Sequence, residues 1–377
     1  MKNKKIRVGI IFGGRSGEHE VSYCSAVSII KAIDKNKYEV IPIGITKEGK
    51  WISPEETAYA LESGKIEGKS TMILLNDPSG KSLIKINNEV KLNKISSKRE
   101  IDVIFPVLHG PYGEDGTMQG LLELADIPYV GAGVAASAIS MDKELMKVIF
   151  KQKDLPVLNW LTVKRKDWQK STQKIIKLIE KKIPYPLFVK PTNLGSSVGI
   201  TKVHKKEELK KAIDLASFYD RKILIEEGIE DAREIECSVL GNDEPQASVV
   251  GEVKPAGEFY DYDSKYIDEG TQLIIPAEIP EEISRRIREI ALSAFKAVDA
   301  AGMARVDFFV SKKTNKIYLN EINTIPGFTE VSMYPRLWIA SGISYADLID
   351  QLIQLALERF QDKNQNKTYY ESKLLNK

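Results

Sequence analysis

The amino-terminal segment is the feature that most limits the fold of this chain. Residues 6–12 (Ile-Arg-Val-Gly-Ile-Ile-Phe) are an apolar run that ends at Gly13-Gly14, and a helix-like stretch follows at 21–33. A second apolar run occupies residues 37–45. A strand, a glycine turn, a helix and another strand form the βαβ pattern, which predicts a parallel sheet covered by helices. Ligands of such sheets bind beyond the carboxyl ends of the strands, so the glycine pair marks a candidate ligand site.

A second strand end of the same kind lies further along the chain. Residues 103–108 form an apolar run that ends at His-Gly. Two polar segments, 17–22 and 109–117, each follow a predicted strand, and Glu18 carries the charge that an ammonium group needs. Residues of segment 17–22 could equally cap the helix that follows them.

Two strand-like stretches near the carboxyl end carry the strongest chemical pattern. Residues 305–310 and 317–323 are joined by a polar turn, which predicts a β-hairpin. Alternate residues of a strand share a face, so the hairpin would gather a guanidinium, two carboxylates and an amide on a small patch. These groups belong to Arg305, Asp307, Glu321 and Asn323. Such hard oxygen ligands suit Mg²⁺, and an arginine would stabilise negative charge on a reacting group, although an ordinary solvated hairpin shows the same spacing.

The segment after the hairpin favours the active-site interpretation. Residues 324–332 begin with Thr-Ile-Pro-Gly. A Pro-Gly turn directly after the acidic strand leaves backbone N–H groups able to face a ligand. Metal-ligand residues on a strand, followed by an exposed turn, are typical of an active site.

A loop of small residues after another predicted strand is a candidate phosphate site. Residues 188–199 read Phe-Val-Lys-Pro-Thr-Asn-Leu-Gly-Ser-Ser-Val-Gly, so the strand delivers Lys190 and a loop with two serines follows. Backbone N–H groups and hydroxyls of such a loop can surround phosphate oxygens, while the lysine supplies a point charge. A flexible surface loop is the competing interpretation.

Two familiar nucleotide motifs do not fit the sequence. Gly-Lys-Ser occurs at 68–70 and 80–82, but the glycine that a Walker A motif requires five residues earlier is Ser63 in one case and Leu75 in the other. The glycines of residues 13–17 lack the dinucleotide spacing. A nicotinamide cofactor is therefore disfavoured.

Two further segments have a more open interpretation. Residues 224–229 form an apolar strand that ends in acidic residues, where backbone groups could bind adenine and a carboxylate could hold ribose. A solvated strand end explains the same residues. Residues 258–266 mix aromatic and charged side chains, which is typical of a loop that closes over a substrate and also of a merely mobile loop.

The pattern along the 377 residues predicts three domains and a polar tail. We expect an N-terminal α/β domain, a central domain, a C-terminal domain and the tail at residues 1–141, 142–229, 230–362 and 363–377. Residues 46–100 are rich in Lys, Asn and Gly and predict an insertion that contains a hairpin.

Composition excludes several classes of protein. A hydrophobic content of 42% and a charged content of 29% describe a soluble globular protein. The formal net charge of +2 gives no reason to expect nucleic acid as a partner, and no apolar run is long enough to span a membrane. Cys24 and Cys237 form no pair motif, and the three scattered histidines form no zinc motif. The basic amino-terminal segment reaches glycines at once, so it predicts a first strand and not a signal peptide.

Taken together, the motifs resemble the D-alanine–D-alanine ligase family of the ATP-grasp superfamily. The matching segments follow the family's order over nearly the whole chain, at residues 13–22, 109–117, 140–143, 190–199, 260–266, 305–307 and 321–327. The resemblance implies an α/β fold of three domains. These are a doubly wound βαβ domain that binds D-alanine, a central ATP-grasp domain and a C-terminal ATP-grasp domain with catalytic groups.

The resemblance also implies a site for ATP and magnesium. The residues that it assigns to ATP are Lys143, Lys190, Ser196, Ser197, Glu226, Glu234 and Lys265. The lysines 143 and 190 and the serines would bind phosphates, and the two glutamates would contact the adenosine part. The ligands of two Mg²⁺ ions, with Mn²⁺ as an alternative, would be Asp307, Glu321 and Asn323.

For the amino-acid substrates, the resemblance assigns one residue group to each chemical task. Glu18 would hold the ammonium group of the first D-alanine, with His109 nearby. Ser332 would bind the carboxylate of the second D-alanine. Arg305 and the Gly327 N–H would form the oxyanion site.

The implied reaction has two steps, for the synthesis of a peptidoglycan precursor. The carboxylate of one D-alanine attacks the γ-phosphate of ATP, and the amine of the second D-alanine then attacks the resulting acyl phosphate. Glu18, Ser196 and Tyr266 would form a hydrogen-bonded triad that locks the loop over the site. Tyr266 favours an amine nucleophile over D-lactate, while D-serine stays open as the second substrate. A nucleotide-binding regulator without catalysis is the alternative from a different class.

The resemblance implies a homodimer, and the need for ATP implies a cytoplasmic enzyme. We expect D-alanine and ATP as partners, with no nucleic acid and no membrane.

Overall fold

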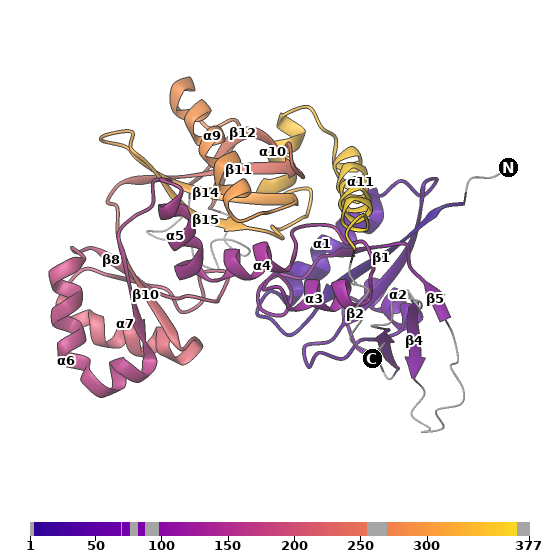
Figure 1. Ribbon diagram of the computed structural model, residues 1–377, viewed down its shortest axis with the longest axis horizontal. Helices are drawn as coiled ribbons and strands as arrows, with labels where there is room; N and C mark the ends of the chain where they lie inside the picture. The colour runs from indigo at the N-terminus through magenta and orange to yellow at the C-terminus, as the bar shows by residue number, and fades with distance from the viewer. Residues whose placement is uncertain (1–3, 69, 76–81, 87–97, 255–269, 368–377) are drawn as a thin grey trace, which may run out of the picture.

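The computed structural model describes residues 4–68, 70–75, 82–86, 98–254 and 270–367. The chain folds into three lobes (Figure 1), of which the first contains two three-stranded sheets and the other two contain one sheet each among the described residues. In Figure 1 the lobe with α1 and β1 lies at the lower right, the lobe with α6 and α7 at the lower left, and the lobe with α9 and β12 above them. None of the helices in the described ranges is long and apolar enough to cross a membrane.

The first lobe contains the predicted parallel sheet, in the order β2-β1-β6. Its strands are β1 (Ile6–Gly13), β2 (Tyr38–Ile45) and β6 (Val103–Pro106). Helix α1 (His19–Ala32) joins β1 to β2, so the βαβ unit is confirmed. Ser22 does not cap this helix: its hydroxyl accepts a hydrogen bond from the Gly13 N–H at 2.8 Å and donates one to the Val107 carbonyl. The side chain thereby ties together the ends of two neighbouring strands.

The insertion between β2 and β6 contains a helix that the sequence interpretation missed. Helix α2 (Pro54–Ser63) begins after Ser53, whose hydroxyl accepts from the Glu56 N–H at 3.3 Å, and ends at Gly64 with φ of +78°. A serine cap, a proline in the first turn and a left-handed glycine are ordinary helix signals. The predicted hairpin is part of an antiparallel sheet of β3 (Thr71–Leu74), β4 (Ser82–Ile86) and β5 (Lys98–Glu100).

Three helices carry the chain from the first lobe to the second. They are α3 (Thr117–Leu124), α4 (Val134–Met141) and α5 (Lys143–Gln152). The Asp142 carboxylate caps α5 by accepting from the backbone N–H groups of Glu144 and Leu145 at 3.1 and 3.2 Å. The cap at Asp142 fixes the start of α5 and thereby the position of Lys143, its first residue.

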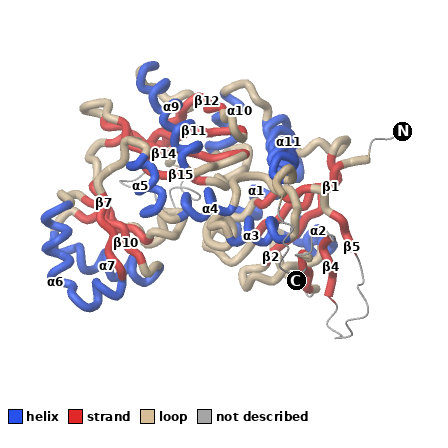
Figure 2. Tube along the Cα trace, viewed as in Figure 1, coloured by secondary structure: helices blue, strands red, loops and turns tan. Residues whose placement is uncertain are grey.

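The central lobe is an antiparallel sheet in the order β7-β10-β8-β9. The strands are β7 (Trp160–Lys164), β8 (Leu187–Pro191), β9 (Thr201–Val203) and β10 (Lys222–Glu227). Helices α6 (Arg165–Lys182) and α7 (Lys206–Tyr219) form its outer side, as Figure 2 shows. Their apolar faces and the sheet share one core, which includes Ile179, Ile213 and Val189.

The third lobe is a five-stranded antiparallel sheet in the order β13-β12-β11-β14-β15. The strands are β11 (Ala232–Gly241), β12 (Gln246–Lys254), β13 (Gln272–Ile274), β14 (Gly302–Ser311) and β15 (Ile317–Asn323). Helix α9 (Glu281–Ala297) packs on this sheet through a core that includes Phe295 and Val306. Helix α10 (Met333–Ala340) follows the Pro-Gly turn.

Helix α11 (Tyr345–Lys363) returns to the first lobe. Its Leu348, Leu352 and Ile353 belong to the same buried cluster as Val8 and Ile10 of β1. The sequence-based domain boundaries stay a prediction, and the last of them assigns to the third domain a helix that also contributes to the core of the first.

Candidate active site

A cavity of about 560 Å³ lies where the three lobes meet. Its wall contains most of the residues that the sequence singled out. They are Glu18, His109, Lys143, Lys190, Ser196, Ser197, Glu234, Arg305, Asp307, Glu321, Asn323, Gly327 and Ser332. The predicted residues Lys265 and Tyr266 lie outside the described residues, and Glu226 lies behind the wall. The fold therefore brings together side chains that are far apart in the sequence.

The polar patch of the predicted hairpin is present on β14 and β15. Arg305 lies opposite Asn323 and Asp307 lies opposite Glu321 in the antiparallel register. Opposite residues of such a pair share a face, so the prediction of one common patch is confirmed. The Asn323 side-chain nitrogen donates to the Asp307 carboxylate at 3.0 Å, which turns the amide oxygen away from that carboxylate.

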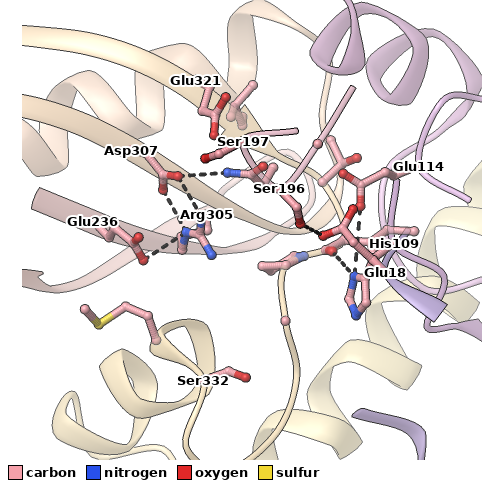
Figure 3. A pocket seen from close by; sticks show the side chains of 18 of the residues that line it. Glu18, His109, Glu114, Ser196, Ser197, Glu236, Arg305, Asp307, Glu321 and Ser332 are labelled. Atoms are coloured by element: carbon pink, nitrogen blue, oxygen red, sulfur yellow. Dashed lines mark hydrogen bonds and ion pairs between the residues drawn. The ribbon is translucent and has the colours of Figure 1, made fainter. Parts of the chain in front are cut away.

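Arg305 lies between two carboxylates in this patch. Its Nε and Nη2 atoms each lie 2.7 Å from an oxygen of Asp307, and its Nε also lies 2.9 Å from Oε2 of Glu236 (Figure 3). The sequence interpretation missed Glu236, which is buried on β11. A signal existed, because Glu234 and Glu236 are two apart on one strand and therefore share a face.

Lys143 projects into the cavity from the first turn of α5. Its ammonium donates to the Leu194 carbonyl at 2.8 Å and lies 3.7 Å from the Glu321 carboxylate. Its backbone N–H donates to the Thr192 carbonyl at 3.0 Å. These contacts link the start of α5, the serine loop and the acidic hairpin in one place.

Lys190 and Glu226 form a buried ion pair next to the cavity. The Lys190 ammonium lies 2.6 Å from the Glu226 carboxylate, and the Lys147 ammonium contacts the other oxygen of that carboxylate. Burial alone would raise the pKa of Glu226, but the two lysines outweigh it and hold this pKa below its usual value. A contact between Glu226 and adenosine stays a prediction, and in this structure both carboxylate oxygens face lysines.

The serine loop contacts the first lobe through Glu18. The Ser196 hydroxyl donates to the Glu18 carboxylate (Figure 3), and a β-carbon at Gly195 or at Gly110 would lie only 2.9 Å from an oxygen of Glu18. Side chains at these two glycines would push the carboxylate away, so the glycines permit the close approach. Two members of the implied triad are thus in contact, and its third member is not described.

His109 connects the first lobe to the Pro-Gly turn. Its Nδ1 atom lies 2.8 Å from the Ile325 carbonyl, and its Nε2 atom lies 3.4 Å from the Ser25 hydroxyl. The same hydroxyl accepts from the Phe328 N–H at 3.2 Å. The turn that carries Gly327 is therefore held by a strand end and by α1 of the first lobe.

Glu114 is a largely buried carboxylate, with a side-chain exposure of 12%, that the sequence interpretation did not assign. One of its oxygens lies 4.0 Å from Nδ1 of His109. Burial, together with the nearby charge of Glu18, raises the pKa of Glu114 well above its usual value, and burial lowers the pKa of His109. Burial thus shifts both pKa values toward the neutral form of each side chain.

Ser332 lies on the far side of the Pro-Gly turn from Glu18 (Figure 3). Its hydroxyl accepts from the Thr329 N–H at 3.1 Å and lies 2.7 Å from the Thr329 hydroxyl. A β-carbon at Gly327 would lie 3.2 Å from this hydroxyl. The turn is thus tight around a hydroxyl that faces the cavity.

The hairpin patch fits a magnesium ion by its donor chemistry. Its two carboxylates, Asp307 and Glu321, are register partners at the cavity wall, and the amide of Asn323 is hydrogen-bonded to Asp307. Among the described residues, no three His, Cys, Asp or Glu side chains are grouped as a metal site. A cation here would therefore need ligands from a substrate or from water besides these oxygens, which is the usual habit of Mg²⁺.

Comparison with known proteins identifies the family to which this architecture belongs. The model described as "D-ala D-ala ligase N-terminus" matches residues 7–132, and the model described as "D-ala D-ala ligase C-terminus" matches residues 149–354. The chain belongs to the D-alanine–D-alanine ligase family. This family uses ATP and Mg²⁺.

Individual ligases resemble the chain over nearly its whole length. A D-alanine–D-alanine ligase of Natranaerobius thermophilus is 53% identical, with 97% of this chain and 98% of the relative covered. The solved D-alanine–D-alanine ligase of Coxiella burnetii is 36% identical with a TM-score of 0.80, and covers 96% of each chain. The VanG D-Ala:D-Ser ligase of Enterococcus faecalis is 37% identical with a TM-score of 0.82, and covers 94% of this chain and 100% of its own. The predicted ATP-grasp fold is therefore confirmed.

Proposed function

We propose that this ligase joins two molecules of D-alanine into D-alanyl-D-alanine, a peptidoglycan precursor, while ATP becomes ADP and phosphate. The observation that carries the proposal is one cavity that combines the Arg305–Asp307–Glu321 patch with Lys143 and Glu18. A cavity with these groups suits an anionic nucleotide on one side and an ammonium group on the other. The family of the chain and its 53% identical relative support the same reaction.

For Mg²⁺, we assign the ligands to Asp307, Glu321 and the amide oxygen of Asn323. When bound, Mg²⁺ would neutralise charge on the phosphate oxygens of ATP. We propose two ions, with Mn²⁺ as a substitute. Arg305 would then lose part of its contact with Asp307 and keep its contact with Glu236, 2.9 Å away.

In the first step, the residues of the cavity would bring two anions together. Glu18 would hold the ammonium group of the first D-alanine, while Lys143 and Lys190 offset the charge of the phosphates. A carboxylate oxygen of D-alanine attacks the γ-phosphorus, and the bond from that phosphorus to ADP breaks. The products of this step are D-alanyl phosphate and ADP.

In the second step, the neutral amine of the second D-alanine attacks the acyl carbon. Ser332 would bind the carboxylate of this D-alanine. Arg305 and the Gly327 N–H would stabilise the oxyanion of the tetrahedral intermediate. The bond from carbon to the phosphate oxygen then breaks, and the amine loses a proton as the peptide forms.

The contact between Ser196 and Glu18 supports a closed site during these steps. Closure would keep water away from the acyl phosphate, which water would otherwise hydrolyse. The serine loop, with Ser197, would also cover the phosphates. We assign Lys265, Glu226 and Glu234 to ATP, and Tyr266 to the closing triad, on the family resemblance.

D-Serine is the second candidate for the accepting amino acid, because the VanG D-Ala:D-Ser ligase shares the fold at a TM-score of 0.82. Phosphate release with ATP and Mg²⁺ separates the candidates when it is measured with D-alanine alone, and then with D-alanine plus D-serine or D-lactate. We expect release with D-alanine alone and the dipeptide as the product in mass spectrometry. Phosphate release only when D-serine or D-lactate is added would mean that this compound, and not D-alanine, is the acceptor. No phosphate release under any combination would favour a non-catalytic regulator.

Three further assignments follow from the family. We propose a homodimer, a cytoplasmic location because ATP is consumed there, and the domain boundaries at residues 141, 229 and 362.

A further inference from the structure

A lysine that does not line the cavity lies directly behind its nucleotide side. Lys147 lies on α5, one helical turn after Lys143, and has an exposed fraction of 1%. Its ammonium contacts one oxygen of Glu226 and donates to the Asn320 carbonyl at 3.3 Å. Asn320 directly precedes Glu321 on β15. Lys147 therefore joins three separate parts of the site: α5, the end of β10 and the acidic hairpin.

The charges around Glu226 are unequal. Two ammonium groups, those of Lys147 and Lys190, share this one carboxylate, and all three side chains are buried. Two basic side chains therefore share one acidic partner; burial lowers the pKa of Lys147, and the charge of Glu226 opposes that shift. A buried lysine is costly unless it is paired, so a cation kept at this place needs a reason beyond packing.

We propose that Lys147 is a positioning residue that leaves the charge of Lys190 available to a phosphate group. If Lys147 were absent, Glu226 would have Lys190 as its only ammonium partner. The two side chains, which lie 2.6 Å apart, would then form a neutral pair. Sharing the carboxylate with Lys147 leaves Lys190 in contact with only one of the two oxygens of Glu226. The inference rests on the proposed ATP site and adds a residue that does not touch ATP.

The contact with Asn320 gives Lys147 a second task. A lysine bound to that carbonyl fixes the separation between Glu226 and the strand that carries Glu321. Loss of the lysine would leave a buried carboxylate with a single partner, which is expected to relax toward Lys190. Both effects lower affinity for the phosphates without altering the residues assigned to D-alanine.

The test is the affinity for ADP, measured by isothermal titration calorimetry in Mg²⁺ buffer. We expect Lys147→Met to raise the Kd of ADP by about tenfold or more, which is the size of a lost charge-assisted contact. KM for ATP should rise in parallel, and KM for D-alanine should stay within about twofold. The matched control is Leu209→Ala in the core of the central lobe, which lowers thermal stability without touching any charge.

A double-mutant cycle with Glu226→Gln separates positioning from general structure. When E226Q is already present, no carboxylate is left to neutralise Lys190, so adding K147M should change the Kd of ADP by less than about threefold. The double variant should also fold, because replacing both partners of a buried ion pair is often tolerated. Equal fold-changes with and without E226Q would overturn the proposal.

Other outcomes are equally decisive. An unchanged Kd for K147M, or an L209A control that weakens ADP as much as K147M does, would show that Lys147 is only structural. The parent protein is assayed alongside for ADP formation with D-alanine. Failure of the parent to form ADP would refute the proposed function. If the parent forms ADP and K147M leaves the Kd of ADP unchanged, only this inference is refuted.

Discussion

Glu226 and Glu114 both lie beside one cavity, and their environments shift the pKa values of the two carboxyl groups in opposite directions. Glu226, on the nucleotide side, lies between two lysines that hold its pKa below the usual value despite burial. Glu114, on the amino-acid side, lies beside His109 and near Glu18, and burial raises its pKa well above the usual value. The residue type is the same, so the difference comes from the neighbours.

The comparison explains how the cavity separates two tasks. The proposed nucleotide side consists of carboxylates that contact lysines and Arg305, and two ammonium groups there, those of Lys147 and Lys190, share the single carboxylate of Glu226. On the proposed amino-acid side, Glu18 lies near Glu114 and His109, and burial shifts the pKa values of these two toward their neutral forms. An ammonium group that enters this side would therefore find its counter-charge in Glu18.

The largest effect should come from removing charge on the nucleotide side. We expect Glu321→Gln to lower ADP formation by about a thousandfold or more, because a metal-ligand carboxylate is lost. Chelation of Mg²⁺ by EDTA should abolish activity in the parent, and added Mg²⁺ should restore it. Glu244→Gln, on an exposed turn of the same sheet, is the control and should leave the rate unchanged. Normal turnover in Glu321→Gln would refute the metal assignment.

A second change keeps the charge of the nucleotide side but removes its geometry. Arg305→Lys retains a cation, yet lysine cannot reproduce the two parallel contacts of 2.7 Å to Asp307 together with the contact to Glu236. We expect kcat to fall by about a hundredfold to a thousandfold, the usual cost of a lost oxyanion donor. Arg286→Lys, on the exposed face of α9, serves as the control. A kcat within about twofold of the parent would exclude Arg305 from the oxyanion site.

A third change tests the contact between the two sides. Ser196→Ala removes the hydroxyl that donates to Glu18, and we expect kcat/KM for dipeptide formation to fall by about tenfold. Because closure would be impaired, the ratio of ADP to dipeptide should rise above one as acyl phosphate is hydrolysed. Ser197→Ala is the matched variant, with the same small change at a neighbouring left-handed residue, and should keep this ratio at one. If the ratio does not change in Ser196→Ala, the hydroxyl does not hold the site closed.

The smallest effect should be seen for Glu114→Gln, and it should depend on pH. Glutamine is similar in shape to a protonated glutamate carboxyl and does not titrate. A carboxyl whose pKa is raised in the folded state stabilises the fold below the ordinary glutamate pKa of about 4.3 and loses that contribution as pH rises. The parent should therefore lose stability above that pH relative to the variant, so the Tm of Glu114→Gln minus that of the parent should increase with pH. A difference that falls with pH would mean that Glu114 is ionised in the folded protein.

The sequence predicts the nucleotide side better than the amino-acid side. Strand periodicity alone placed Arg305, Asp307, Glu321 and Asn323 on one face, because the order of side chains along a hairpin follows from its local geometry. Glu236 could have been found by the same rule from Glu234. Helix α2 was missed even though Ser53, Pro54 and Gly64 carry ordinary helix signals.

Other features depend on contacts that no local pattern contains. Lys147 shares a helix face with Lys143, but its burial follows only from where β10 and β15 lie. Glu114 belongs to a polar motif that suggests an exposed loop, and its raised pKa follows from burial and from the nearby charge of Glu18. The family resemblance supplied the roles of residues, including Glu18 and Ser332, that single-sequence patterns left undecided.

The return of α11 to the first lobe has a consequence for synthesis. The ribosome makes β1 long before it makes Leu348, Leu352 and Ile353, which cover the same core. Until these residues are made, the apolar side of β1 lacks part of its cover. The nascent chain then exposes a surface to which chaperones or other nascent chains could bind. A polypeptide truncated before residue 345 would contain the whole parallel sheet of the first lobe. It would still be prone to aggregate, because α11 would be missing.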